Sequence, residues 1–236
     1  MADAVAQAER WLAEPDGPTR VVYFVNAHTL NLACEDAPYR SVLGTADVVY
    51  GDGTGVRWAA RMLHGARLAD NVNGTDFIPA LFAAQAHHGY RYYVLGGTEE
   101  QNQRAAAHAS RTFHGWTLAG HHHGYLDAAA SARVVEAIND AKPQLLLVGM
   151  GNPGQERWLH AHRLQLRVPL CVGVGGLFTY WSGHIDRAPA WTRRIGFEWV
   201  HLLLRQPEKG RRYLLGNPLF LARVAARRWQ SRADRR

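Results

Sequence analysis

The sequence holds an aspartate between two glycines, Gly51-Asp52-Gly53, directly after the apolar run ADVVY. Glycines on both sides allow the backbone to turn sharply and allow a ligand to approach closely. A carboxylate in such a turn can act as a general base that takes a proton from an attacking hydroxyl group. The alternative is that Asp-Gly supplies only turn chemistry, and the dipeptide by itself does not decide between the two interpretations.

Other polar side chains also follow apolar runs, after VVYFV, within NVNGTDF and after LLLVGMGNPG. They are Asn26, Asn71, Asn73, Thr75, Asp76, Gln155 and Glu156. Taken singly, each asparagine is typical of a helix cap or a turn, and Thr75 is a candidate N-cap. Taken together they predict a site, because the carboxyl ends of parallel strands meet at one edge of a sheet, where ligands bind.

Residues 149–154, GMGNPG, match the pattern G-x-G-x-x-G after an apolar run. In dinucleotide-binding proteins an acidic residue about 20 positions later holds the ribose. Here that region reads PLCVGVGG and contains no acidic residue. We therefore interpret the glycine loop as a turn that lines a site for phosphate or sugar. An NAD-dependent oxidoreductase is kept as an alternative, which predicts binding of a nicotinamide cofactor.

The three histidines of GHHHGY, residues 120–125, are candidate metal ligands. Successive side chains of an extended segment point to opposite faces, so three adjacent histidines cannot readily converge on one ion. No HExxH, CxxC or Asp-x-Asp pattern accompanies them. We predict a solvated loop, no metal and no cofactor. Arginines and backbone amides would then have to neutralise any bound diphosphate.

The elements that must position these residues follow from apolar runs that alternate with helix-length segments. Strands are predicted at 21–26, 46–53, 91–97, 116–120, 144–151 and 169–176, and helices at 4–13, 28–35, 54–64, 75–88, 98–112, 127–141 and after Pro153. Strands that are apolar throughout indicate a sheet covered on both faces. The predicted fold is α/β, a doubly wound, mostly parallel, Rossmann-like sheet with a helical C-terminal appendage.

The net charge of +7 is concentrated at the C-terminal end. Residues 191–236 hold 12 Lys or Arg and three acidic residues, interleaved with Trp, Phe, Tyr and Leu. We predict an α/β catalytic domain over 1–190 and a basic amphipathic helical appendage over 191–236. Such a segment suits an anionic membrane surface or a helical flank with a solvated basic face. A nucleic-acid-binding α/β protein is the alternative from another class.

The two cysteines, Cys34 and Cys171, lie in apolar runs and predict buried thiols in a reducing compartment. The first 15 residues lack the basic and apolar regions of a secretory signal. No run approaches the roughly 18 apolar residues of a spanning helix. We expect a cytoplasmic protein that associates peripherally with the inner face of the bacterial plasma membrane.

The order of motifs adds a resemblance. VNAHTLNLA, ADVVYGDGTGVRWAARMLHG, NVNGTDF, LLLVGMGNPGQERWL, VGVGGLFTYWSGHIDRAPAWTRRIGFEW and QPEKGRRYLLGNP follow one another along the chain. This series resembles the WecG/TagA/CpsF glycosyltransferases, glycosyltransferase family 26, over residues 20–217. The Gly-x-Pro-x-Gln-Glu and Arg-Ala-Pro-x-Trp elements are specific when they occur in this order.

The resemblance implies an inverting transfer from a UDP-sugar to a saccharide linked through diphosphate to undecaprenol, in cell-surface polysaccharide or teichoic acid synthesis. The transferred sugar would be of the N-acetylmannosamine type, its uronate or glucose. By motif position, Asp52 resembles the family's catalytic base. Substrate contacts are predicted for Asn26, Thr54, Asn73, Asp76, Gly149, Gly151, Gln155, Glu156, Gly175 and Gly176, and diphosphate contacts for Arg187, Arg193, Arg194 and Arg212. No nucleic acid partner is expected, and self-association into a homo-oligomer is left open.

Overall fold

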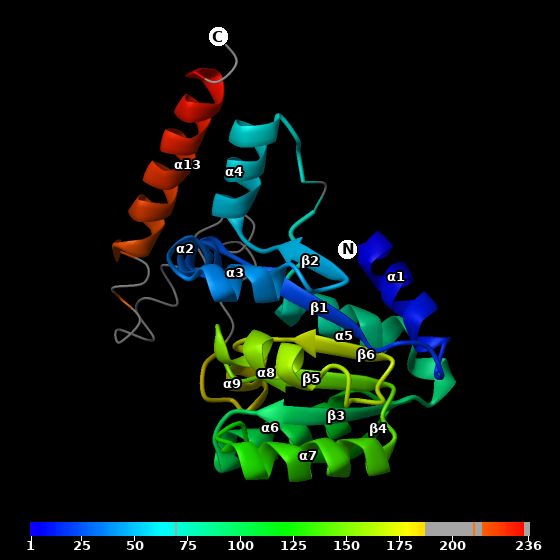
Figure 1. Ribbon diagram of the computed structural model, residues 1–236. Helices are drawn as coiled ribbons and strands as arrows, with labels where there is room; N and C mark the ends of the chain where they lie inside the picture. The colour runs from blue at the N-terminus through cyan, green and yellow to red at the C-terminus, as the bar shows by residue number, and fades with distance from the viewer. Residues whose placement is uncertain (69, 187–209, 211–213, 234–236) are drawn as a thin grey trace. The chain divides into compact units, whose positions relative to one another are not determined.

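The computed structural model describes residues 1–68, 70–186, 210 and 214–233 (Figure 1). In these residues six strands form one sheet in the order β2-β1-β6-β5-β3-β4, with parallel pairing. The strands are β1 Arg20–Val25, β2 Val48–Gly51, β3 Arg91–Gly96, β4 Thr117–His122, β5 Leu145–Gly149 and β6 Leu170–Gly173. The prediction of a doubly wound parallel α/β fold is confirmed.

Helices alternate with the strands along the chain. They are α1 Ala2–Leu12, α2 Ala27–Glu35, α3 Ala37–Leu43, α4 Thr54–His64, α5 Gly74–Ala84, α6 Glu99–Thr112, α7 Ala128–Ala141, α8 Gly154–His162, α9 Leu177–Trp181 and α13 Gly216–Ala233, with a 3₁₀ turn η1 at Ala86–His88. The predicted helix 75–88 is therefore too long. It ends at Ala84, and the following turn closes at Gly89 with φ +67°.

The prediction of a solvated loop at the three histidines is wrong for two of them. His121 and His122 belong to strand β4, which pairs with β3 as far as Leu95 opposite His122. The pairing register shifts between Tyr92 and Tyr93, where the ring of Tyr93 lies over Gly120. The strand was predicted to end at Gly120, where a glycine commonly breaks a strand. In the structure the strand continues, and Gly120 leaves room for the ring of Tyr93 on the neighbouring strand.

Both faces of the sheet are covered, which explains the continuous apolar runs. In β5, Leu145 and Leu147 belong to a core cluster shared with α1, α5, α6 and α9. Their neighbours Leu146 and Val148 are also fully buried and point to the opposite face, because side chains alternate along a strand. That second face carries α7 and α8, which a hydrogen bond from Trp158 Nε1 to Ser131 Oγ joins (Figure 1).

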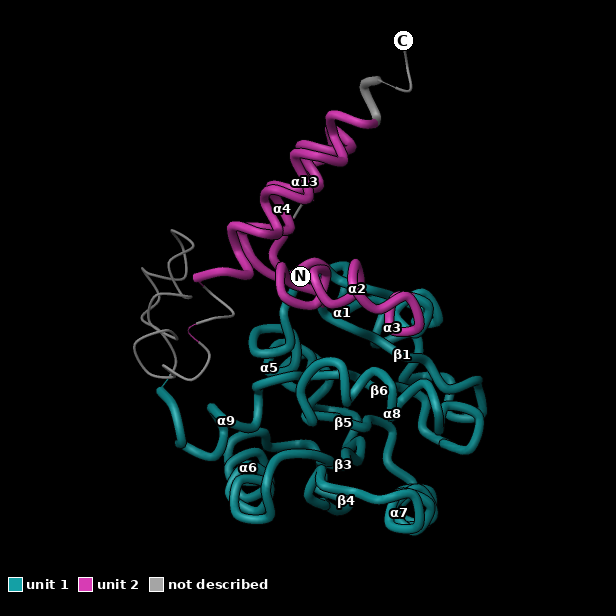
Figure 2. The backbone as a smooth tube through the Cα atoms, turned by 60° about the vertical axis from the view of Figure 1, so that its left-hand side comes forward, with its two compact units in different colours: residues 1–24, 41–50, 72–186 teal, residues 25–40, 51–71, 187–236 magenta. Residues whose placement is uncertain are grey.

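The chain divides into two compact units (Figure 2). Unit 1 comprises residues 1–24, 41–50 and 72–186 and contains most of the sheet, and unit 2 comprises 25–40, 51–71 and 187–236. In unit 2, Phe220 and Val224 of α13 pack on Ala59 of α4, with Leu30 of α2 at the margin of this cluster. Of the predicted appendage, the structure describes Gly210 and residues 214–233, which include α13. The boundary of a catalytic domain at residue 190 stays a prediction.

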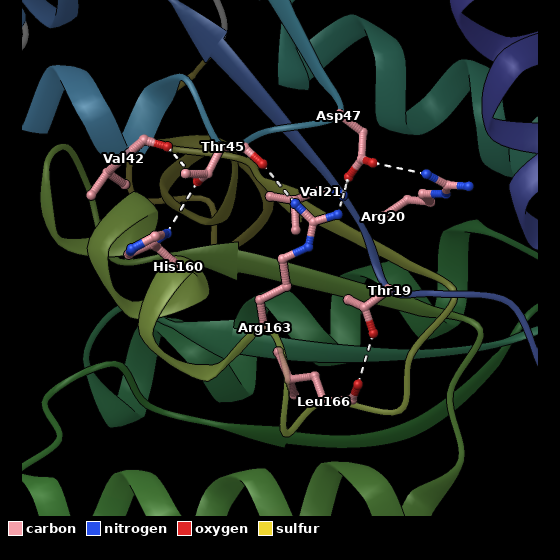
Figure 3. A network of polar contacts seen from close by, with 9 residues as sticks. All are labelled: Thr19, Arg20, Val21, Val42, Thr45, Asp47, His160, Arg163 and Leu166. Atoms are coloured by element: carbon pink, nitrogen blue, oxygen red, sulfur yellow. Dashed lines mark hydrogen bonds and ion pairs between the residues drawn. The ribbon is translucent and has the colours of Figure 1, made fainter.

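A cluster of ion pairs lies at the amino ends of β1 and β2 in unit 1 (Figure 3). Asp47 accepts hydrogen bonds from Arg20 Nη1 at 3.0 Å, from the backbone N–H of Val21 at 2.8 Å and from Arg163 Nη2 at 2.7 Å. Arg163 also donates to the carbonyl of Thr45 at 2.6 Å. The cluster therefore ties the segment before β2 to β1 and to the end of α8.

Candidate active site

Asp52 lies directly after strand β2, in unit 2, and its side chain is half-buried. Its backbone N–H donates to the carbonyl of Val25 at 2.8 Å. The next residue, Gly53, has φ +92° and ψ 160°, a conformation that is nearly restricted to glycine. The N–H of Gly53 donates to Asn71 Oδ1 at 2.6 Å. The carboxylate is thus carried by a turn whose backbone is fixed on both sides, as a general base requires.

The helix after this turn is α4, and the predicted substrate residue Thr54 is its exposed first residue. Asn26 in the same unit is the N-cap of α2. Its Oδ1 accepts hydrogen bonds from the N–H of His28 at 3.1 Å and of Thr29 at 3.2 Å, and from the Thr29 hydroxyl at 3.2 Å. The cap interpretation of Asn26 is confirmed. A contact of Asn26 with substrate stays a prediction.

In unit 1, Asn73 is the N-cap of α5, so the prediction that Thr75 caps this helix is wrong. Asn73 Oδ1 accepts from the N–H of Asp76 at 2.9 Å and from the Thr75 hydroxyl at 2.5 Å. Asn73 Nδ2 donates to Asp76 Oδ2 at 2.8 Å. The short side chain of asparagine carries both an acceptor and a donor. Asn73 can therefore cap the backbone at the start of α5 and also bind the carboxylate of Asp76. A Cβ at Gly74 would lie 3.3 Å from the carbonyl of Val174, which places the start of α5 beside the loop after β6.

Gln155 and Glu156 follow β5 at the start of α8, and both side chains are buried, with exposed fractions of 1% and 0%. Gln155 Oε1 accepts from the N–H of Gly175 at 2.9 Å, and Gln155 Nε2 donates to Glu156 Oε1 at 2.7 Å. Asn152 Nδ2 donates to the same Glu156 oxygen at 2.5 Å. The structure thus brings these predicted site residues together with the loop after β6, through contacts within the protein.

The four predicted loop glycines differ in their surroundings. A Cβ added at Gly151, Gly175 or Gly176 would meet no atom of the described residues within 4 Å, so no described side chain covers the backbone at these positions. Gly151 and Gly175 also have positive φ angles, +75° and +57°. A Cβ at Gly149 would lie 2.6 Å from Cδ2 of Phe178, so this glycine makes room for a core ring. Contact of any of the four with a nucleotide stays a prediction.

Sequence reasoning missed Asn102, which lies on α6 and is fully buried. Asn102 Nδ2 donates to the carbonyls of Gly96 at 2.9 Å and His122 at 2.8 Å, and Asn102 Oδ1 pairs with His121 Nδ1 at 2.7 Å. It therefore joins the carboxyl ends of β3 and β4. A signal existed, because Asn102 falls on the buried helical stripe with Ala105, Ala106 and Ala109.

The four predicted diphosphate arginines, Arg187, Arg193, Arg194 and Arg212, lie outside the described residues. Within the described part of the chain, no three His, Cys, Asp or Glu side chains are grouped so that they could hold a metal ion. An open hollow of about 490 Å³ lies at the amino ends of β3 and β5, beside the end of α1, and includes none of the predicted site residues.

The comparison with known sequence families decides the class of protein. The profile described as "Glycosyl transferase WecG/TagA/CpsF family" matches residues 1–234. This chain belongs to the WecG/TagA/CpsF family of glycosyltransferases. The resemblance seen in the sequence is confirmed, and the family match favours transferase chemistry over the nucleic-acid-binding and oxidoreductase alternatives.

Three relatives carry the same name, N-acetylglucosaminyldiphosphoundecaprenol N-acetyl-beta-D-mannosaminyltransferase. The chain is 29% identical to that of Bacillus spizizenii over 81% of this chain and 73% of the relative. It is 29% identical to that of Staphylococcus aureus strain MRSA252 over 95% and 87%, and 27% identical to that of Bacillus subtilis strain 168 over 82% and 75%. The sequence similarity to these proteins therefore extends over most of this chain and most of each relative. Among its described helices, none is long and apolar enough to cross a membrane.

Proposed function

We propose that this glycosyltransferase moves a sugar of the N-acetylmannosamine type from a UDP-sugar to a saccharide linked through diphosphate to undecaprenol. The observation that carries the proposal is the family match over nearly the whole chain. The name that these relatives share supports both the transferred sugar and the lipid-linked acceptor. The uronate and glucose remain the competing donor sugars, because identities of 27–29% leave room for a change of specificity.

The proposed reaction is a single displacement at the anomeric carbon of the donor. A hydroxyl group of the acceptor attacks this carbon, the bond to the UDP oxygen breaks with its electron pair, and the configuration inverts. Asp52 accepts the proton of the attacking hydroxyl. General base catalysis of this kind typically makes a reaction about 10² to 10⁴ times faster than it is without the base. The half-buried position of Asp52 in a fixed turn supports this role.

The departing UDP must be stabilised, because charge builds on its diphosphate as the sugar leaves. No atom of the described residues would contact a Cβ at Gly151, Gly175 or Gly176, which supports close approach of the donor to the two loops after β5 and β6. The arginines at 187, 193, 194 and 212 are proposed to neutralise the diphosphate, as the family resemblance implies. Arginine suits this task because its planar fork donates two parallel hydrogen bonds to phosphate oxygens.

The acceptor's lipid would hold the enzyme at the inner face of the cytoplasmic membrane, and helix α13 supports such a peripheral association. Its inward residues Phe220 and Val224 pack on Ala59 of α4, within unit 2. On the side of α13 turned away from these residues, Leu221 is 43% exposed and Trp229 is 78% exposed. An exposed helix face with tryptophan and leucine is typical of segments that lie in the interface of a bilayer.

The proposal is tested by measuring UDP release from a panel of UDP-sugars with a short-chain polyprenyl diphosphate saccharide as acceptor. We expect release that depends on the acceptor and is fastest with UDP-N-acetylmannosamine. Release with another UDP-sugar would keep the reaction class and change the donor. Absence of acceptor-dependent release from every UDP-sugar, in protein shown to be folded by circular dichroism, would refute the proposed reaction.

A further inference from the structure

The loops after β5 and β6 leave the sheet toward opposite faces. Residues 150–153 lead into α8, on the face that α7 also covers, and residues 174–176 lead into α9, which packs against α6. The two strands are neighbours in the sheet. Diverging loops at the carboxyl ends of adjacent strands are where α/β proteins bind ligands. The position of one loop relative to the other therefore decides which backbone groups a ligand meets there.

Three hydrogen bonds connect the two loops through the side chains of Gln155 and Glu156. Asn152, in the first loop, donates from Nδ2 to Glu156 Oε1 at 2.5 Å. Gln155 Nε2 donates to the same oxygen at 2.7 Å, and Gln155 Oε1 accepts from the N–H of Gly175, in the second loop, at 2.9 Å. We call this series, Asn152, Glu156, Gln155 and Gly175, the loop relay.

The relay is inside the protein rather than on its surface. Gln155 is 1% exposed and Glu156 is 0% exposed, so a ligand could touch either side chain only by displacing other atoms. Gly173 contributes by having no side chain, because a Cβ there would lie 3.0 Å from Gln155 Nε2. On the other side, the Tyr23 hydroxyl donates to the backbone carbonyl of Glu156 at 3.1 Å. The Tyr23 bond holds the backbone at the start of α8, and the packing beside Gly173 leaves the Gln155 side chain little room to move.

We propose that Gln155 and Glu156 are positioning residues that fix the Gly175 loop against the Gly151 loop, and that they act on the donor only through these loops. The proposal rests on the proposed UDP-sugar donor. Gly175 has φ +57°, and the side-chain acceptor of Gln155 holds its N–H in that conformation. Without this hydrogen bond from Gly175 to Gln155, the glycine loop can adopt other conformations. The backbone at Gly175 and Gly176 would then no longer be held at a fixed position relative to Gly151.

The test exchanges the two side chains. Gln155→Glu alone places two carboxylates in contact and removes the donor to Glu156. Adding Glu156→Gln restores a complete set of hydrogen bonds, since a carboxylate at position 155 can accept from Gly175 and from the new amide nitrogen. The second N–H of that nitrogen can donate to Asn152 once the Asn152 amide turns over to present its oxygen. We expect Gln155→Glu to raise the Kd for UDP and the KM for the donor by about tenfold or more, with a smaller effect on kcat at saturation. The exchanged pair should return both to within about threefold of wild type.

Gln155→Met is the second disruptive variant, because it keeps the volume and adds no charge. For all variants we would measure thermal unfolding and hydrogen exchange at the Gly175 amide. We expect this amide to be protected in the wild type, exposed in Gln155→Glu and Gln155→Met, and protected again in the exchanged pair. Exchange at Gly175 needs no ligand, so it tests the relay even where the wild type fails to bind UDP, a result that would refute the proposed donor instead.

Two results would overturn the positioning role. The first is unchanged protection of the Gly175 amide in Gln155→Met, which would mean that the hydrogen bond does not hold the loop. The second is an exchanged pair that regains protection at Gly175 and still binds UDP as weakly as Gln155→Glu. That outcome would make the Gln155 amide or the Glu156 charge a direct substrate contact.

Discussion

Arg163 Nη2 and Asp47 Oδ2 lie 2.7 Å apart and form an ion pair between the end of α8 and the segment before β2 (Figure 3). The same carboxylate accepts from Arg20 and from the backbone of Val21. The Asp47 side chain is 14% exposed. If its charge were removed, water could therefore replace few of the interactions that the two arginines would lose. This pair ties the edge strand β2 to the rest of the sheet.

We predict that Asp47→Asn lowers the free energy of unfolding by about 2 kcal/mol, less than for a fully buried pair, because the arginines are partly solvated. For a chain of this size that corresponds to a fall in Tm of roughly 4 to 8 °C. Glu100→Gln is the matched control. It breaks the exposed Glu100–Arg104 pair, whose side chains are 74% and 65% exposed, and should cost less than about 0.5 kcal/mol. Equal effects in calorimetry would contradict the prediction.

Asp52→Asn tests the proposed base, because it keeps the shape of the side chain and removes its ability to take a proton. We expect the transfer rate at saturating substrates to fall by about 10² to 10⁴, while the Kd for UDP from calorimetry stays near the wild-type value. Asp140→Asn, at an exposed position on α7, is the control and should leave both unchanged. Weakened UDP binding with intact transfer at saturation would count against the base role.

Gly53→Ala tests the turn that carries this carboxylate. Gly53 has φ +92° and ψ 160°, and a Cβ there would meet no atom within 4 Å in the described part of the chain. The cost is therefore conformational, about 1 to 3 kcal/mol, and would be relieved by a shift of the turn. We expect the transfer rate to fall by more than the loss of folded protein alone would explain. Gly65→Ala, at the end of α4 with φ +67°, should lower stability by about 1 kcal/mol and spare transfer. Equal loss of transfer in the two variants would exclude a special role for the Asp52 turn.

Tyr92→Phe should stabilise the protein. The Tyr92 hydroxyl is buried and has no hydrogen-bond partner among the described residues, so its removal should gain about 1 kcal/mol. Burial raises the pKa of Tyr92 to about 12. The unfolded chain loses this proton near pH 10, so stability should fall as the pH rises from about 10 to 12. Urea unfolding at pH 8, 10 and 11 should show a shallower fall for the variant, and a slope equal to that of the wild type would contradict the assignment.

Trp229→Ala tests the proposed membrane face of α13. We expect binding to vesicles that contain anionic phosphatidylglycerol to weaken by roughly tenfold in a sedimentation assay, because an interfacial tryptophan buries a large apolar area. Leu164→Ala is the control, since Leu164 is exposed on unit 1 and lies outside this face. The same loss in both variants would argue against α13 as the anchor. Tighter, salt-sensitive binding to DNA than to vesicles would favour the nucleic-acid alternative.

Much of the fold could be predicted because its signals are local. Apolar runs such as LLLVG indicate strands buried on both faces, and β5 is buried at every residue. Asn26 caps α2 through bonds to residues two and three positions later, and a cap of this kind is legible from neighbouring residues. The ends of strands and helices depend on tertiary contacts as well. At Gly120 the sequence shows a strand breaker, whereas the structure shows a glycine that accommodates Tyr93.

The sequence by itself determined the fold class, the family and the place of Asp52 after a strand, because these depend on periodicity and on the order of short motifs. Only the tertiary structure decided which side chains meet across the chain. Asp47 and Arg163 are 116 residues apart and Gln155 and Gly175 are 20 apart. Such pairs form because strand order and crossovers bring their elements together, and no local pattern encodes that order. For the same reason Gln155 and Glu156, which the motif presents as pocket residues, are buried between two loops.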